Sequence, residues 1–114
     1  MHNALTNMQA VVTGAAQGLG RGMAKMLAEQ GAAVTIADIQ IEKAQAAAAD
    51  LESAGLNVNA GHLDVTDSAA VDQFFTNYLE TNGRLDILVN NAGLGQSVTP
   101  IVELSDEEWR RVLA

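Results

Sequence analysis

Three glycines that follow a short apolar run could form a binding site for a phosphate group. Residues 13–20 read TGAAQGLG, with glycine at positions 14, 18 and 20. Gly14 permits the backbone angles of a sharp turn, Gly18 leaves the backbone open to a pyrophosphate, and Gly20 lets the next helix approach a sheet closely. The start of that helix would present free N–H groups and a positive dipole end to the anion. A turn that only redirects the chain is the alternative.

Two aspartates further along could bind the rest of a nucleotide. Asp38 comes 18 residues after Gly20, where a carboxylate can accept both ribose hydroxyls and would repel a 2′-phosphate. Gln17 and Ile39 stand where a Lys or Arg could otherwise bind such a phosphate, so NAD is favoured over NADP. Asp64 could meet the exocyclic amine of an adenine. The alternatives are a solvated loop residue for Asp38 and a helix-entry residue for Asp64.

Alternating strand and helix patterns would position these residues. Short apolar runs predict strands at residues 9–13, 33–37, 57–63 and 86–90. Helices are expected between them, and the first would turn towards the sheet an apolar face formed by Leu19, Met23, Met26 and Leu27. This alternation predicts an α/β fold, a three-layer doubly wound parallel sheet of the Rossmann type, incomplete, with strand order 3-2-1-4. Ligands of such sheets bind beyond the carboxyl ends of the strands.

The last quarter of the chain predicts a loop and the start of a fourth helix. Ser105 and Glu108 form a capping box, and Leu104 and Trp109 fit the accompanying hydrophobic staple. With no fifth strand expected, the strand at 86–90 would be an open edge of an apolar sheet. We therefore interpret residues 1–114 as the N-terminal part of a single dinucleotide-binding domain.

The composition of the chain argues against several classes of function. The 114 residues are 48% hydrophobic and 18% charged, which is ordinary for one globular domain. The net charge of −8 argues against a nucleic-acid surface, which needs clustered Lys and Arg. The sequence has no cysteine, which excludes disulfides and thiolate zinc sites and agrees with a cytoplasmic location. No signal peptide and no membrane-spanning run of ~20 apolar residues is found. We expect no metal, nucleic-acid or membrane partner.

Taken together, these motifs resemble those of the short-chain dehydrogenase/reductase family. Residues 13–20 resemble its TGxxxGxG cofactor motif, residues 90–93 its NNAG motif, and residues 64–65 its adenine-contacting pair. The resemblance covers essentially the whole chain. It implies an NAD(P)-dependent oxidoreductase that transfers hydride between the nicotinamide and a small-molecule alcohol or ketone, and that commonly forms homo-oligomers.

The resemblance also implies a role for each matching residue. The pyrophosphate loop would be formed by Gly14, Ala16, Gln17, Gly18, Leu19 and Gly20. The adenosine would be contacted by Asp38 at the ribose, by Ile39 beside the adenine, and by Asp64 and Val65 at the adenine ring. The ribose side of the cofactor would be lined by Asn91, Ala92 and Gly93, whereas Asn90 would mainly tie the sheet together.

The family's catalytic Asn–Ser–Tyr–Lys set has no match in this chain. By resemblance, its Asn would lie just past Ala114, and its Ser and Tyr-x-x-x-Lys further on. Tyr78 is the only tyrosine and lies on an expected apolar helix face, which indicates a core residue. We therefore expect this chain alone to be inactive.

Two other functions stay open. One is a non-catalytic nucleotide-binding module, which the missing catalytic set permits. The other is a methyltransferase-like domain that binds S-adenosylmethionine, since residues 18–22 contain G-x-G-x-G. The spacing between Gly14 and Gly18 and the NNAG motif argue against the second.

Overall fold

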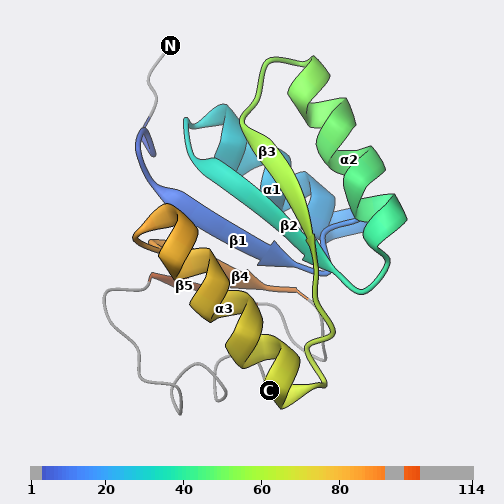
Figure 1. Cartoon of the computed structure of the whole chain (residues 1–114). Helices are drawn as coiled ribbons and strands as arrows, with labels where there is room; N and C mark the ends of the chain where they lie inside the picture. Colours follow the sequence, from blue (N-terminus) through green and yellow to red (C-terminus); the bar gives the residue numbers. More distant parts are fainter. Residues whose placement is uncertain (1–3, 92–96, 101–114) are drawn as a thin grey trace.

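The computed structural model describes residues 4–91 and 97–100 (Figure 1). Its elements in chain order are β1 (Gln9–Thr13), α1 (Gly18–Glu29), β2 (Ala33–Asp38), α2 (Ile41–Ser53), β3 (Val58–His62), α3 (Ser68–Asn82), β4 (Ile87–Asn90) and β5 (Ser97–Pro100). The strands form one sheet in the order β3-β2-β1-β4-β5. Neighbours among the first four strands are all parallel. The doubly wound fold and the strand order 3-2-1-4 are confirmed.

The helices cover both faces of the sheet. Figure 1 shows α3 on one face and both α1 and α2 on the other. Strand β1 contributes to both cores, because successive side chains of a strand point to opposite faces. Ala10 and Val12 belong to the core with α1 and α2, whereas Val11 belongs to the core with α3. All three are fully buried, which explains why the strands lack a polar-apolar alternation.

Helix α1 packs on the sheet through small residues more than through large ones. Its buried residues are Gly20, Ala24, Leu27 and Ala28. Leu19 and Met26 are each 57% exposed, so the prediction that both lie on the packed face is wrong. The reason is the orientation of α1: the line through Gly20, Ala24 and Leu27 faces the sheet, and at 3.6 residues per turn Leu19 and Met26 lie to one side of it.

Strand β4 is not the open edge that the sequence predicts. Residues 97–100, expected to be loop, form β5, which pairs antiparallel with β4 and places Asn90 opposite Ser97. Val98 and Thr99 are β-branched, which favours a strand, and Pro100 is tolerated at the end of an edge strand. The helix expected from Ser105 lies outside the described residues.

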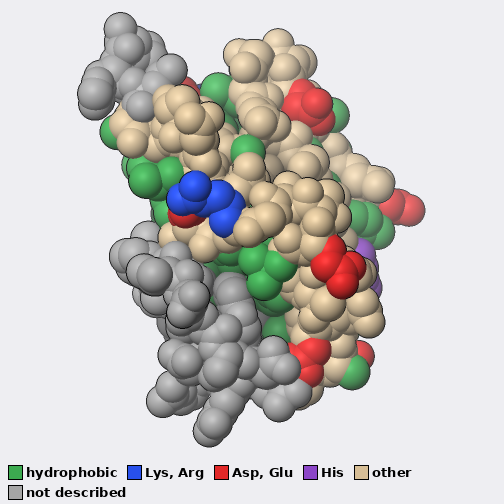
Figure 2. All heavy atoms as spheres, turned by 60° about the vertical axis from the view of Figure 1, so that its left-hand side comes forward, with side chains coloured by type: hydrophobic (Ala, Val, Ile, Leu, Met, Phe, Trp, Pro, Cys, Tyr) green, Lys and Arg blue, Asp and Glu red, His purple; other side chains and the backbone are tan. Residues whose placement is uncertain are grey.

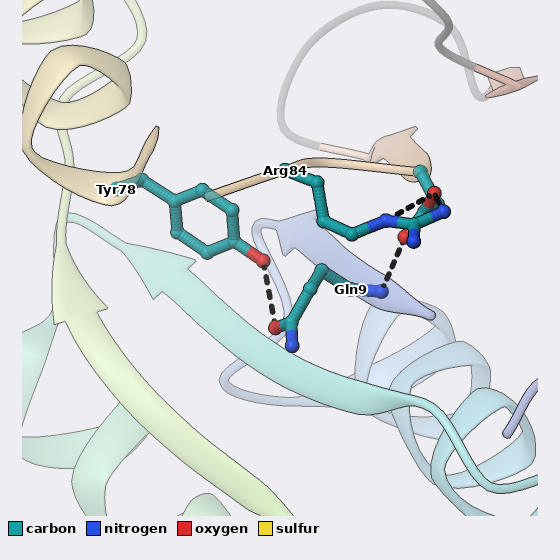
Figure 3. Close-up of polar contacts among 4 residues, drawn as sticks. Gln9, Tyr78 and Arg84 are labelled. Carbon is teal, nitrogen blue, oxygen red and sulfur yellow. Dashed lines mark hydrogen bonds and ion pairs between the residues drawn. The ribbon is translucent and has the colours of Figure 1, made fainter. Parts of the chain in front are cut away.

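Side chains tie the amino ends of β1 and β4 to α3 (Figure 3). The Gln9 backbone N–H donates to Asp86 Oδ2 (2.8 Å), and the Tyr78 hydroxyl donates to Gln9 Oε1 (3.4 Å). Arg84 forms an ion pair with Asp86. Partial burial raises the pKa of Asp86, but hydrogen bonds from Arg84 and Gln9 and the Arg84 charge outweigh it and lower that pKa overall. Burial, with a smaller contribution from the Asp86 charge, raises the pKa of Tyr78 to about 12. Tyr78 is therefore a buried structural residue.

Candidate functional site

The glycine loop between β1 and α1 adopts a conformation that requires glycine at two positions. Gly14 and Gly18 have φ angles of 63° and 65°. This left-handed region is costly for residues that carry a Cβ. A Cβ built on Gly18 would meet nothing within 4 Å. The space beside Gly18 is therefore open, as a group approaching its backbone would need.

Gly20 is required for a different reason, which is close packing. A Cβ at this position would lie 2.6 Å from the Gly14 carbonyl oxygen and 2.5 Å from Asn91 Nδ2. The first of these atoms is backbone and cannot move aside without displacing the loop. The start of α1 therefore lies directly against the loop and the end of β4, as the sequence predicts for this glycine.

The first turn of α1 has N–H groups that no capping side chain meets. Its N-cap residue Gln17 has extended backbone angles and makes no side-chain capping bond, and the first turn contains no acidic residue. The leading N–H groups of a helix have no partner within the helix, and the helix dipole makes this end positive. An anion such as a pyrophosphate would accept hydrogen bonds from these N–H groups and would be attracted by the positive end of the dipole.

The loop is anchored from both neighbouring strands. On the β2 side, the Gly14 N–H donates to the Ala37 carbonyl (2.9 Å), and the Ala16 N–H donates to Asp38 Oδ2 (3.2 Å). On the β4 side, Asn91 Nδ2 donates to the Gly14 carbonyl (3.0 Å). The structure thus brings residues from three separate segments, all selected from the sequence, to one place at the carboxyl edge of the sheet.

Asp38 lies directly beside the loop, as a ribose ligand would have to. Strand pairing sets Thr13 opposite Ala37, so the turns that follow β1 and β2 are adjacent. The second carboxylate oxygen, Oδ1, accepts from the Gln40 N–H (2.8 Å). Each carboxylate oxygen can accept a further hydrogen bond, which leaves capacity for ribose hydroxyls. Ile39 is 56% exposed and offers an apolar surface next to the acid.

Asp64 and Val65 lie at the end of β3 and form the turn into α3. Asp64 Oδ1 accepts from the Thr66 N–H (2.9 Å) and from Thr66 Oγ1 (2.6 Å). The side-chain bond, followed by the backbone bond, lowers the pKa of Asp64. Val65 is half-buried and packs against the core beneath α3. Both hydrogen bonds of the carboxylate stay within its own turn, as the helix-entry alternative implies, and the adenine contact stays a prediction.

A buried threonine joins β1 to the end of β4. Thr13 is fully buried; its hydroxyl donates to Asn90 Oδ1 (3.2 Å) and accepts from the Asn91 N–H (3.1 Å). Asn90 thus ties the sheet together, as expected. The sequence shows Thr13 as the end of an apolar run and the start of the glycine motif, but neither position reveals that it links β1 to the end of β4. Ala92 and Gly93, the other predicted residues of this segment, lie outside the described residues.

The described residues offer neither a metal-binding cluster nor a membrane-spanning helix. Within 4–91 and 97–100, no three His, Cys, Asp or Glu side chains form a group that could hold a metal ion. No helix of these ranges is long and apolar enough to cross a bilayer. On the face shown in Figure 2, the acidic side chains are scattered, and the basic side chains in view lie beside an acidic one. That face presents no broad basic surface among its described residues.

Comparison with known sequences gives consistent matches. A family model described as short chain dehydrogenase matches residues 8–114. Sorbitol dehydrogenase of Cereibacter sphaeroides is 42% identical over 110 residues, which cover 96% of this chain and 41% of that protein. Galactitol 2-dehydrogenase of Agrobacterium fabrum is 43% identical over 108 residues, with 95% and 41% covered. The chain thus spans less than half the length of these relatives.

Solved structures agree with the sequence matches. A metagenomic short-chain oxidoreductase, crystallised in complex with NADP, superposes with a TM-score of 0.77 at 38% identity, over 81% of this chain and 42% of that one. A short chain dehydrogenase from Mycobacterium smegmatis gives a TM-score of 0.76 at 42% identity, over 97% of this chain and 47% of that one.

Proposed function

Because the chain belongs to the short-chain dehydrogenase family, we propose that residues 1–114 form the N-terminal, dinucleotide-binding part of an oxidoreductase. The reaction would transfer hydride between a nicotinamide cofactor and a small-molecule alcohol or ketone. The observation that carries the proposal is the glycine loop, which leads into an uncapped helix start beside Asp38. The short coverage of the relatives supports a longer protein, in which the proton-transfer groups lie beyond Ala114.

Candidate contacts can be named for the pyrophosphate, the adenine and the ribose of a dinucleotide. The open backbone at Gly18 and the N–H groups at the start of α1 would hold the pyrophosphate, and Gln17 and Leu19 would border it. Ile39 would lie against one side of the adenine, with Asp64 and Val65 near its edge. Asn91 would line the ribose side of the cofactor together with Ala92 and Gly93, which lie outside the described residues. The bound nicotinamide supplies the hydride chemistry, which the protein orients.

Proteins of this family use NAD or NADP, and for this chain we favour NAD. The Asp38 carboxylate, held in place by two backbone N–H groups, would accept the ribose hydroxyls and repel a 2′-phosphate. The neighbouring Gln17 and Ile39 carry no positive charge that could offset this repulsion. One structural relative is crystallised in complex with NADP, so our preference for NAD rests on Asp38 and its neighbours and not on the fold.

Calorimetric titration of the protein with three ligands tests the proposal. We expect NAD to bind, NADP to bind at least tenfold more weakly because of like-charge repulsion, and S-adenosylmethionine to give no heat of binding. Tighter binding of NADP than of NAD would overturn the cofactor preference. Binding of S-adenosylmethionine without either dinucleotide would overturn the proposed function altogether.

A further inference from the structure

The Asp38 carboxylate makes one hydrogen bond that the sequence does not reveal and that a ribose ligand does not need. Its Oδ1 accepts from Gln40 within its own turn, but its Oδ2 accepts from the Ala16 N–H in the glycine loop (3.2 Å). Ala16 is only 6% exposed, so water has little access to replace the carboxylate as partner of this N–H. A buried N–H without a partner is destabilising, so the bond to Asp38 constrains the loop.

This contact is not a general consequence of an acid at the end of a strand. Asp64 occupies the corresponding position after β3, and its carboxylate bonds only to Thr66 in the same turn. Asp67, at the same edge of the sheet, bonds only to the first N–H groups of α3. Among the hydrogen bonds that the described residues make to these three carboxylates, the one from Ala16 is thus the only one that connects two turns.

We propose that Asp38 is a positioning residue for the glycine loop in addition to its role at the ribose; the inference rests on the proposed dinucleotide site. Because the Ala16 N–H is committed to Asp38, the pyrophosphate would be bound by the N–H groups from Gln17 onward. The carboxylate would then bridge loop and ribose, since each of its oxygens keeps a second acceptor direction. Removing the acid would relieve the repulsion of a 2′-phosphate and at the same time loosen the loop that receives the pyrophosphate.

The test compares Asp38→Asn with Asp67→Asn in the full natural protein. Asparagine keeps the size of Asp38 but has one acceptor oxygen. We expect the shorter bond from Gln40 in the same turn (2.8 Å) to retain that oxygen, so that the Ala16 N–H (3.2 Å) loses its partner. Asp67→Asn removes the same charge from the same edge, and asparagine caps a helix as well as aspartate does. Thermal unfolding verifies that both variants fold. If Asp38→Asn does not fold, Asp38→Glu replaces it, because the longer side chain keeps both oxygens but displaces them from Ala16.

The binding probe is 2′,3′-dideoxyadenosine 5′-diphosphate, measured beside ADP. The dideoxy compound reaches the loop with its phosphates but has no ribose hydroxyl for Asp38. We expect Asp38→Asn to weaken the dideoxy probe roughly 3- to 10-fold and ADP by more, while Asp67→Asn changes neither. A loss confined to ADP would show that Asp38 is a ribose ligand alone and would overturn the positioning role.

Amide hydrogen exchange of the protein without ligand provides a readout that is independent of binding. We expect the Ala16 amide to exchange roughly tenfold faster in Asp38→Asn and to be unchanged in Asp67→Asn. Unchanged exchange at Ala16 would overturn the proposal even if both probes bind more weakly. If neither probe binds the unaltered protein, the proposed function fails, and the exchange rates still decide the positioning role.

Discussion

Helices α1 and α3 begin at the same edge of the sheet, yet their first N–H groups have different partners. At α3, Asp67 is an extended N-cap residue whose Oδ1 accepts from the Ala69 and Ala70 N–H groups. At α1, Gln17 is also extended but makes no capping bond. The protein's own carboxylate therefore caps the start of α3, whereas the start of α1 is where we propose that the pyrophosphate binds. The residue at the N-cap is thus one of the features that distinguish the two helix starts.

Helix α2 shows that the lack of a side-chain cap is not enough to make a helix start suitable for an anion. Its N-cap residue Gln40 also makes no side-chain capping bond, but Glu42 places an acid in the first turn. No glycine with positive φ precedes α2 directly, whereas Gly14 and Gly18 precede and begin α1. An anion site at this edge therefore needs both an uncapped start without acids and a loop that leaves the backbone open.

The largest expected effect comes from closing the space at the start of α1. Gly20→Val would force a side chain against the Gly14 carbonyl and Asn91. We expect NAD binding to fall at least 100-fold and the free energy of unfolding to drop by about 1–3 kcal/mol. Calorimetry and urea unfolding measure the two effects.

Gly22→Ala is the matched control for Gly20→Val. A Cβ at Gly22 meets nothing within 4 Å. Alanine in the helix interior should stabilise the protein by about 0.5–1 kcal/mol and leave NAD binding unchanged. If Gly20→Val bound NAD as well as this control does, the close packing at the loop would not matter for the site.

Gln17→Asp would convert the start of α1 into one that resembles α3. The new carboxylate should cap the helix and raise the free energy of unfolding by about 0.5–1 kcal/mol. It would also occupy the N–H groups and repel the pyrophosphate, so NAD binding should weaken roughly tenfold. Stability and affinity are thus predicted to change in opposite directions. A variant that binds NAD more tightly would contradict the assignment of this helix start.

Asp67→Ala makes the opposite change at α3. Loss of the cap should cost about 1 kcal/mol in the free energy of unfolding, measured by chemical denaturation. NAD affinity should stay the same, because the start of α3 lies outside the proposed pyrophosphate site. A drop in affinity as large as that of Gln17→Asp would remove the distinction between the two helices.

The smallest effect concerns the far end of α3, where Tyr78 contacts Gln9. The pKa of Tyr78 is raised to about 12, so the unfolded chain, whose tyrosine titrates near 10, loses the proton first. The free energy of unfolding should therefore fall as pH rises from about 10 to about 12. Tyr78→Phe should abolish this slope and cost only about 0.5–1 kcal/mol at neutral pH, since it removes one long hydrogen bond. An equal slope in both proteins would exclude Tyr78 as its source.

Local patterns predict most of the fold because they depend on neighbours in sequence. The apolar runs locate four strands, and the glycine spacing locates the loop with its two left-handed residues. The exposure of Leu19 and Met26 does not follow from the apolar spacing, since it depends on which line of α1 faces the sheet. Strand β5 is too short to show a periodicity and is defined by its pairing with β4.

The candidate site likewise combines features that local sequence reveals with contacts between residues far apart in the sequence. Asp38 is recognisable by its position after an apolar run, but its bond to Ala16 follows from the register that sets Thr13 opposite Ala37. Likewise, the hydrogen bonds of Thr13 to Asn90 and Asn91 join residues 77 and 78 positions apart. Contacts of this kind are fixed by the pairing of β1 with its neighbours, which the sequence does not display.

Backbone amide chemical shifts measured while NAD is added test the central claim most directly. The claim is that the start of α1 receives the pyrophosphate and the start of α3 does not. We predict that the largest shifts occur at the amides of Gln17 to Gly20 and that those of Ala69 and Ala70 stay in place. Larger shifts at Ala69 and Ala70 than in the glycine loop would contradict the account.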